Sequence, residues 1–84
     1  MDLIVYSKPG CHLCEGLIEK LQQIKTLNLE IRDITTQPDW FNAYQYEIPV
    51  LSQKTPEGEK QIPRPSPRLS VTQLEQFLQK HITA

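Results

Sequence analysis

The sequence predicts an α/β fold of the order βαβαββα, in which helices flank a four-stranded mixed sheet. Three observations support this prediction. Residues 3–6 form an apolar run typical of a buried strand, helical periodicity follows at once, and alternating apolar residues return over residues 27–33. A strand, a helix and a strand in this order form a right-handed βαβ unit with parallel strands. The later elements add an antiparallel strand pair and two more helices.

The first strand and the first helix are joined by a polar turn. Leu3 to Tyr6 are β-formers, and Ser7-Lys8-Pro9-Gly10 follows them. From Cys11 onward, apolar residues recur at helical spacing, which predicts an amphipathic helix at about residues 12–26. Its apolar stripe contains Leu13, Leu17, Ile18, Leu21 and Ile24.

A second strand and a short aromatic helix come next. The alternating positions of the strand are Leu27, Leu29, Ile31 and Asp33. Thr35, Thr36 and Pro38 are typical of a helix start, and aromatic residues then lie three to four positions apart. They predict a helix at about 37–45 whose aromatic stripe belongs to the core: Trp40, Phe41 and Tyr44.

The C-terminal third predicts a hairpin and a last helix. Residues 47–52 and 60–62 read as antiparallel strands with a loose connection at 55–58, although a proline within the first strand is unusual. Three alternate prolines at 63–67 remove backbone donors and favour an extended surface connection. Ser70 to Gln73 match a capping box before a helix at about 71–81. The apolar face of that helix is Val71, Leu74, Phe77, Leu78 and Ile82.

Length and composition indicate a single globular domain over residues 1–84. A hydrophobic fraction of 38% separates the chain from disordered sequences, and a net charge of -1 gives no reason to expect nucleic acid or a membrane as partner. The apolar run within Met1–Tyr6 is too short for a signal peptide or a membrane span. We therefore expect a cytoplasmic monomer.

Cys11 and Cys14 are the candidate catalytic residues. A pair three positions apart closes too short a loop to stabilise a small fold, so it indicates redox chemistry or metal ligation. Cys11 precedes a helix whose free amides and dipole favour a thiolate, so we expect its pKa below the ~8.5 of a free cysteine. Lys8 and His12 would act in the same direction when charged. Cys14, one turn later, can attack a mixed disulfide formed by Cys11.

Two other interpretations of the pair stay open. A zinc site would need two more ligands, and because His81 is isolated near the C-terminus, they would have to come from a second subunit or from outside. Two inert core cysteines are the other possibility, although Pro9-Gly10 favours an exposed loop. The redox interpretation is favoured because the motif follows a strand and opens a helix. We expect no metal site and no bound cofactor.

Over its whole length the chain resembles the glutaredoxin and thioredoxin superfamily, specifically the short bacterial glutaredoxin-like domains. The resemblance depends on Val5-Tyr6-Ser7-Lys8-Pro9-Gly10-Cys11-His12-Leu13-Cys14, on Ile48-Pro49-Val50 about 35 residues later, and on the helix order. It implies a dithiol thiol-disulfide oxidoreductase with a redox-active disulfide, acting in electron transport and redox homeostasis. Its partners would be protein or small-molecule disulfides, with glutathione as co-substrate or a thioredoxin-type reductase for recycling.

The resemblance also implies a set of substrate-binding residues. Ile48-Pro49 would carry a cis peptide bond facing the cysteines and leave the backbone groups of Ile48 free for an extended substrate; a trans proline on an edge strand is the alternative. Lys8 matches a lysine that contacts the carboxylate of glutathione in glutaredoxins, or it is an ordinary surface lysine. His12 either tunes the thiolate or is simply exposed.

One departure concerns glutathione. Glutaredoxins that bind it carry a Gly-Gly pair and an acidic residue after the last strand, whereas residues 63–70 here are Pro-Arg-Pro-Ser-Pro-Arg-Leu-Ser. The cradle for glutathione is therefore altered or absent, although Ser70 at the start of the last helix could still hold a carboxylate. The buried aspartate of thioredoxin is also missing from the first strand.

Two functions of other classes remain as alternatives. The chain could be an iron-sulfur or metal carrier in which Cys11, with glutathione or a second subunit, supplies the ligands. It could also be a binding module with an inactive cysteine pair, docking a partner through residues 63–68.

Overall fold

A computed structural model describes residues 1–82, and the last two residues of the predicted domain 1–84 lie outside them. The elements are β1 (Asp2–Ser7), α1 (His12–Leu21), β2 (Asn28–Asp33), the 3-10 helix η1 (Ile34–Thr36), α2 (Pro38–Tyr44), β3 (Val50–Thr55), β4 (Gly58–Ile62) and α3 (Val71–His81). Apart from η1, this is the predicted order. None of the helices in the described part of the chain is long and apolar enough to cross a membrane.

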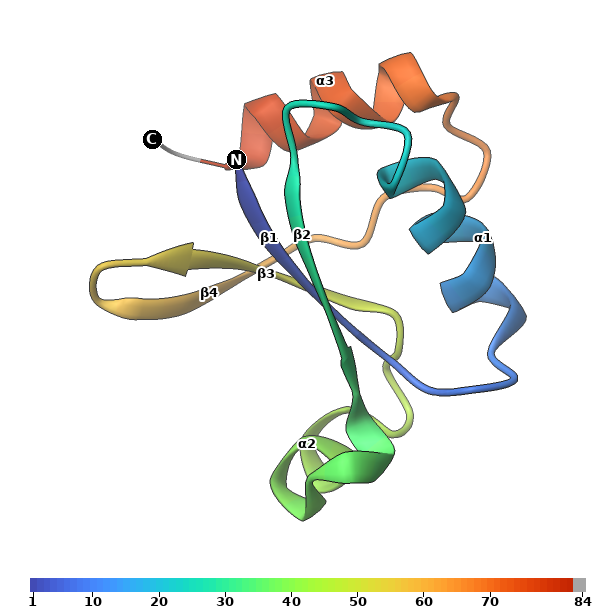
Figure 1. The fold of residues 1–84 in the computed structure, drawn as a ribbon, viewed down its shortest axis with the longest axis vertical. Helices are drawn as coiled ribbons and strands as arrows, with labels where there is room; N and C mark the ends of the chain where they lie inside the picture. The colour runs from blue at the N-terminus through green and yellow to red at the C-terminus, as the bar shows by residue number, and fades with distance from the viewer. Residues whose placement is uncertain (83–84) are drawn as a thin grey trace.

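The four strands form one mixed sheet in the order β2-β1-β3-β4. The central strand β1 pairs in parallel with β2 and antiparallel with β3, and β3 pairs antiparallel with β4. Val5, in the middle of β1, lies opposite Ile31 on one side and Leu51 on the other. The predicted four-stranded α/β fold is therefore confirmed. Figure 1 shows the sheet with α1 and α3 on one side and α2 on the other.

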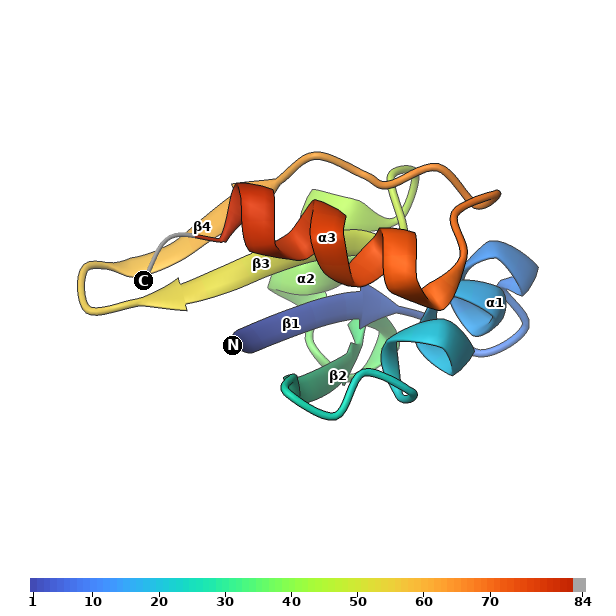
Figure 2. The same ribbon diagram turned by 90° about the horizontal axis from the view of Figure 1, so that it is seen from above.

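Two separate cores cover the two faces of the sheet. Leu3 and Val5 of β1 face the larger core, where Leu21 of α1 and Leu74 and Leu78 of α3 are buried against them. Ile4 and Tyr6, the alternate residues of the same strand, face the smaller core below α2, which also contains the partly buried residues Trp40, Phe41 and Tyr44. Since β1 is buried on both faces, its sequence is apolar throughout. Figure 2, turned by 90°, shows α3 lying across the sheet on the side of the larger core.

The first helix ends at Leu21, so the predicted end at residue 26 is wrong. The amides of Gln23 and Ile24 donate to the carbonyls of Lys20 and Leu21, both at 3.1 Å, and these i→i+3 bonds tighten the chain into turns. Ile24 is nevertheless buried in the larger core. The apolar periodicity therefore extends past the end of the helix, because Ile24 still packs into the core from the turn that leads to β2.

The last helix has its predicted position, whereas the hairpin strands, predicted at 47–52 and 60–62, span Val50–Thr55 and Gly58–Ile62. Thr55 pairs with Gly58, so a two-residue turn joins β3 to β4 and the predicted loose connection is wrong. Pro49 lies just before β3 and not within it, which removes the conflict between a proline and a strand ladder. Ser70 and Gln73 form the predicted capping box, and α3 spans the predicted residues 71–81.

A polar cluster joins three strands on the face of the smaller core. The hydroxyl of Tyr6 donates to the carboxylate of Glu59 and accepts from the guanidinium of Arg32 at 2.8 Å, while Arg32 and Glu59 form an ion pair at 3.0 Å. The guanidinium carbon of Arg32 also lies 5.2 Å from the ring centroid of Trp40. Burial, and then the hydrogen bond to Glu59, raise the pKa of Tyr6 to about 12. The cluster therefore stabilises β1 against both β2 and β4.

Replacing Tyr6 by phenylalanine tests this cluster. Tyr6→Phe removes hydrogen bonds to two charged groups, and we expect the free energy of unfolding at pH 7 to fall by about 1 to 2 kcal/mol. Because folding raises the pKa of Tyr6 from 10.0 to about 12, its contribution is fully present below pH 10 and is lost as the pH rises through 12. Urea unfolding at pH 7 and pH 11 measures the difference.

The control is Tyr46→Phe, which removes the hydroxyl of a side chain that is 90% exposed. This variant should match the parent at both pH values. If the Tyr6→Phe variant were as stable as the parent at pH 7, the hydrogen bonds of the Tyr6 hydroxyl would contribute nothing to the stability of the fold.

Candidate active site

Cys11 lies at the start of α1, as predicted, and caps the helix. The chain leaves β1 at Ser7 and turns through Gly10, whose φ of 84° is a left-handed conformation that favours glycine. The amide of Cys11 donates to the carbonyl of Lys8, which closes the turn. At the N-cap position, the Sγ of Cys11 accepts a hydrogen bond of 3.3 Å from the amide of Cys14. The side chain of Cys11 therefore occupies the position where serine or aspartate usually caps a helix.

Cys14 occupies a very different environment from Cys11. Its residue surface is 1% exposed, whereas Cys11 is partly exposed, and both are free thiols. Burial is the largest cause that raises the pKa of the Cys14 thiol to about 12, followed by the hydrogen bond with Cys11 and the charge of Cys11. The backbone of Lys8 and the charge of Arg64 act in the opposite direction. Cys14 is thus a protonated thiol at neutral pH whose amide donates to the partly exposed Cys11.

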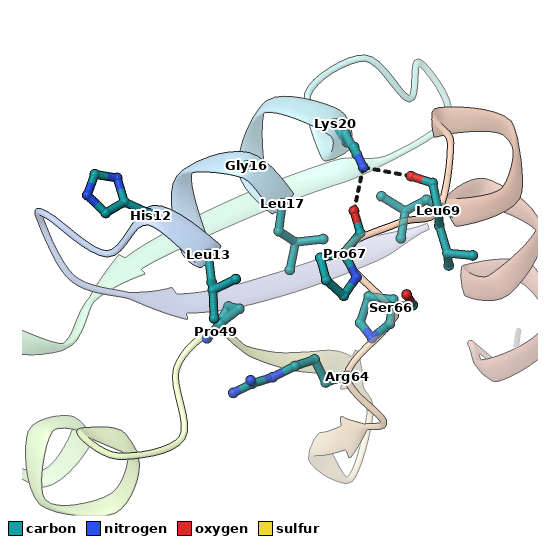
Figure 3. Close-up of a pocket in the computed structure, with 12 residues that line it drawn as sticks. His12, Leu13, Gly16, Leu17, Lys20, Pro49, Arg64, Ser66, Pro67 and Leu69 are labelled. Atoms are coloured by element: carbon teal, nitrogen blue, oxygen red, sulfur yellow. Dashed lines mark hydrogen bonds between the residues drawn. The ribbon is translucent and has the colours of Figure 1, made fainter.

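The peptide bond between Ile48 and Pro49 is cis, which confirms the prediction for this position. Pro49 is buried, and Figure 3 shows it next to Leu13, the residue just before Cys14. The amide of Ile48 donates to the carbonyl of Tyr44 at 3.1 Å. The expectation that both backbone groups of Ile48 stay free is therefore wrong for the amide, because the turn after α2 binds it.

An apolar groove of about 250 Å³ runs beside the cysteine motif. α1 forms one wall with Leu13, Gly16 and Leu17, residues 64–67 and Leu69 form the other, and Pro49 lies at the end near Leu13 (Figure 3). Leu13, predicted as part of the core stripe, is 58% exposed because it faces this groove and not the sheet. The groove was not predicted from the sequence. The signal for it was Leu13, an apolar residue placed between two cysteines that were expected to be accessible.

The proline-rich segment contains no helix or strand and is mostly exposed, as predicted, and it also packs against α1. Pro65 is buried, and the Nζ of Lys20 donates to the carbonyls of Pro67 and Leu69 at 2.8 and 2.7 Å. Figure 3 shows both bonds at the end of the groove away from His12. Lys20 therefore holds in place the segment where glutathione-binding glutaredoxins have glycines.

The other predicted binding residues are not all gathered at the cysteines. Lys8 is exposed and approaches them through its backbone. His12 borders the groove, but its side chain is 96% exposed, points away in Figure 3 and lies 3.7 Å from the carboxylate of Glu15. Ser70 accepts from the amide of Gln73 and follows Leu69 at the Lys20 end, so the structure does not bring it together with Cys11.

Metal-ligating side chains do not cluster in the described part of the chain. No group of three histidine, cysteine, aspartate or glutamate residues lies together within residues 1–82. His81, the remaining candidate from the sequence, packs on Phe77 with ring centroids 4.4 Å apart at the far end of α3. Cys11 and Cys14 are therefore not joined by a third ligand from these residues.

Comparison with known proteins gives a family model and solved structures that are similar to this chain. The model of the family described as glutaredoxin-like domain (DUF836) matches residues 2–79. The X-ray structure of the structural genomics target XcR50 from X. campestris is 26% identical, with a TM-score of 0.62 over 93% of this chain and 96% of that chain. The solution structure of XcR50 is 25% identical, with a TM-score of 0.64 over 100% of both chains.

A more distant structure agrees in fold. Thioredoxin 1 from Thermosipho africanus TCF52B is 19% identical and has a TM-score of 0.59, covering 95% of this chain and 97% of its own. At this identity the likeness concerns the fold alone, which is thioredoxin-like. No curated protein matches the chain.

Alkylation of the reduced protein tests the contrast between the two thiols. We expect iodoacetamide at pH 7.5 to modify Cys11 and leave Cys14 unmodified, because Cys14 is buried and its pKa of about 12 leaves almost no thiolate. Mass spectrometry of peptides after timed quenching gives both rates. A Cys14→Ser variant should keep the rate of Cys11, and equal rates at both positions in the parent would contradict this description of the site.

Proposed function

We propose that this chain, which belongs to the glutaredoxin-like domain family, is a dithiol oxidoreductase that reduces disulfides with Cys11 as nucleophile and Cys14 as resolving thiol. The observation that carries the proposal is the bond from the Cys14 amide to the Sγ of Cys11 at the start of α1. This bond holds the partly exposed sulfur of Cys11 at the N-cap, one helical turn from Cys14, where a substrate disulfide can reach it. Family membership supports this chemistry without naming a substrate.

In the first step, the thiolate of Cys11 attacks one sulfur of a substrate disulfide. A bond forms between Cys11 and that sulfur, the substrate S–S bond breaks, and the other substrate sulfur leaves as a thiolate. Cys14 does not compete for the substrate, because burial and the neighbouring Cys11 keep it protonated. The roles of the two cysteines thus follow from exposure and charge.

In the second step, Cys14 attacks the Sγ of Cys11 and releases the second substrate thiol. Two of the causes that raise the pKa of Cys14 are the hydrogen bond with Cys11 and its charge, and both are removed when Cys11 enters a mixed disulfide. The backbone of Lys8 and the charge of Arg64 continue to favour the Cys14 thiolate. Cys14 therefore becomes more acidic at the stage when it has to attack.

The complete reaction oxidises one dithiol and reduces one disulfide. Cys11 and Cys14 give up two electrons, the first substrate sulfur leaves as a thiolate, and the second leaves as a thiol with the proton of Cys14. A thiol reductant has to regenerate the dithiol, and glutathione or a thioredoxin-type reductase has the required chemistry. We propose that the chain acts as a monomer in the cytoplasm, where thiols are kept reduced. Its proposed role there is redox homeostasis.

Serine substitutions at the two cysteines test the proposed function. We expect Cys11→Ser to reduce a disulfide substrate no faster than buffer, because the nucleophile is lost. Cys14→Ser should react once and remain as a mixed disulfide, which intact-mass spectrometry detects as an adduct on Cys11. Insulin and hydroxyethyl disulfide represent protein and small substrates.

Each variant is compared with the parent in thermal unfolding to exclude a loss of the fold. If both variants reduce disulfides as fast as the parent, Cys11 and Cys14 are not the reacting groups. A coloured protein after anaerobic purification would instead favour a metal or iron-sulfur carrier.

A further inference from the structure

We infer that Arg64 selects disulfide substrates that carry a carboxylate next to the reacting cysteine, such as acidic protein segments. This inference rests on the proposed function and adds a substrate class to it. It depends on the position of the Arg64 guanidinium, on the absence of a carboxylate partner for it in residues 1–82, and on its charge acting on the site.

Arg64 reaches the cis-proline loop from the proline-rich segment. Its Nη2 donates to the carbonyl of Glu47, two residues before Pro49. Figure 3 shows the side chain extended below Pro49, at the same end of the groove as Leu13. Arg64 also lines a second hollow on the other side of Pro49, which Tyr46 and Glu47 border. Its guanidinium is therefore held at the point where groove, cis-proline and cysteine motif meet.

The backbone that carries Arg64 is restricted. Pro63 and Pro65 flank it, and each proline ring fixes its own φ. Pro65 is buried and the carbonyl of Pro67 accepts a hydrogen bond from Lys20, so the segment is held at two points along the groove. An arginine presented from such a backbone loses less conformational freedom on binding than one on a mobile loop.

The charge of Arg64 lacks a carboxylate partner in the described part of the chain. The ion pairs among residues 1–82 use other cations: His12 with Glu15, Arg32 with Glu30 and Glu59, and Lys54 with Glu30. Lys20 is bound to two carbonyls. The positive charge of Arg64 nevertheless acts on the active site, because it favours the thiolate of Cys14. A cation near the reacting sulfurs thus remains able to bind an anion.

A substrate chain bound next to Pro49 would bring its own side chains over Arg64. A guanidinium has five N–H donors, of which the bond to Glu47 uses one, so it can still hold a carboxylate with two parallel bonds. The apolar wall formed by Leu13 and Leu17 suits an apolar neighbour in the same substrate. An acidic residue beside the disulfide cysteine therefore fits this end of the groove better than a neutral one.

Matched peptides test the inference. Two disulfide-linked, acetylated and amidated peptides differ by Glu or Gln beside the cysteine, and kcat/KM is measured for each with the reduced protein. We expect the parent to prefer the Glu peptide by about fivefold at low salt, and the preference to decrease at high salt, as for a partly exposed ion pair. Arg64→Gln should bring the ratio to about one, and Arg64→Lys should retain part of it.

The matched control is Arg68→Gln, which removes the same charge from an exposed position of the same segment that does not line the groove. It should keep the parental ratio. If Arg64 only braced the loop through Glu47, Arg64→Gln would slow both peptides equally and leave the ratio unchanged, which would overturn the inference.

A further pair of substrates identifies the source of the carboxylate. Glutathione disulfide is compared with its carboxyl-esterified form. An Arg64-dependent preference in this pair as well would extend the selection to small-molecule carboxylates.

An equal rate for the Glu and Gln peptides in the parent overturns the role of Arg64 while the proposed function stands. If the parent reduces no disulfide at all, the proposed function fails and the inference fails with it.

Discussion

The burial of β1 on both faces is the constraint on which the rest of the molecule depends. Leu3 and Val5 pack below α1 and α3, and Ile4 and Tyr6 pack against the α2 side, so the strand cannot slip by one residue without exchanging the two cores. Its register is fixed further by β2 and β3. The turn after Ser7 therefore begins at a defined point, and Cys11 caps α1 next to the sheet.

The site separates two thiols that are only three residues apart. The N-cap position leaves Cys11 partly exposed, while the first turn of α1 directs Cys14 into the protein, where it is 1% exposed. The hydrogen bond that the Cys11 sulfur accepts links it to the backbone of its partner. One helical turn is thus sufficient to give the two cysteines different chemistry, because burial and charge act on them unequally.

The proline-rich segment forms the second wall of the groove beside the cysteine motif. Glycines would leave a flexible backbone at this position, whereas Pro65 and the bonds of Lys20 hold the segment against α1. The groove that remains is small, apolar along α1 and bordered by the Arg64 guanidinium near Pro49. The groove beside the cysteine motif therefore depends on the wall built by residues 64–67 and Leu69 as much as on α1.

The sequence by itself determined the features that follow from local patterns. The apolar run at residues 3–6, the helical stripe after Cys11 and the capping box at Ser70 each predicted an element that the structure contains, because side-chain period and helix capping are local properties. The Cys11-Cys14 spacing predicted two thiols one turn apart at the start of a helix, where the structure places them, and Ile48-Pro49 was identified by resemblance.

Only the tertiary structure decided which side chains surround that pair. Leu13 belongs to the groove and not to the core, and the amide of Ile48 is already bound by Tyr44. Ser70 lies with Lys20, and Arg64 reaches Glu47 in the cis-proline loop from 17 residues away. These positions depend on how α1, the proline-rich segment and the cis-proline loop pack together. Contacts between distant segments have no local period, and therefore the sequence pattern alone could not predict them.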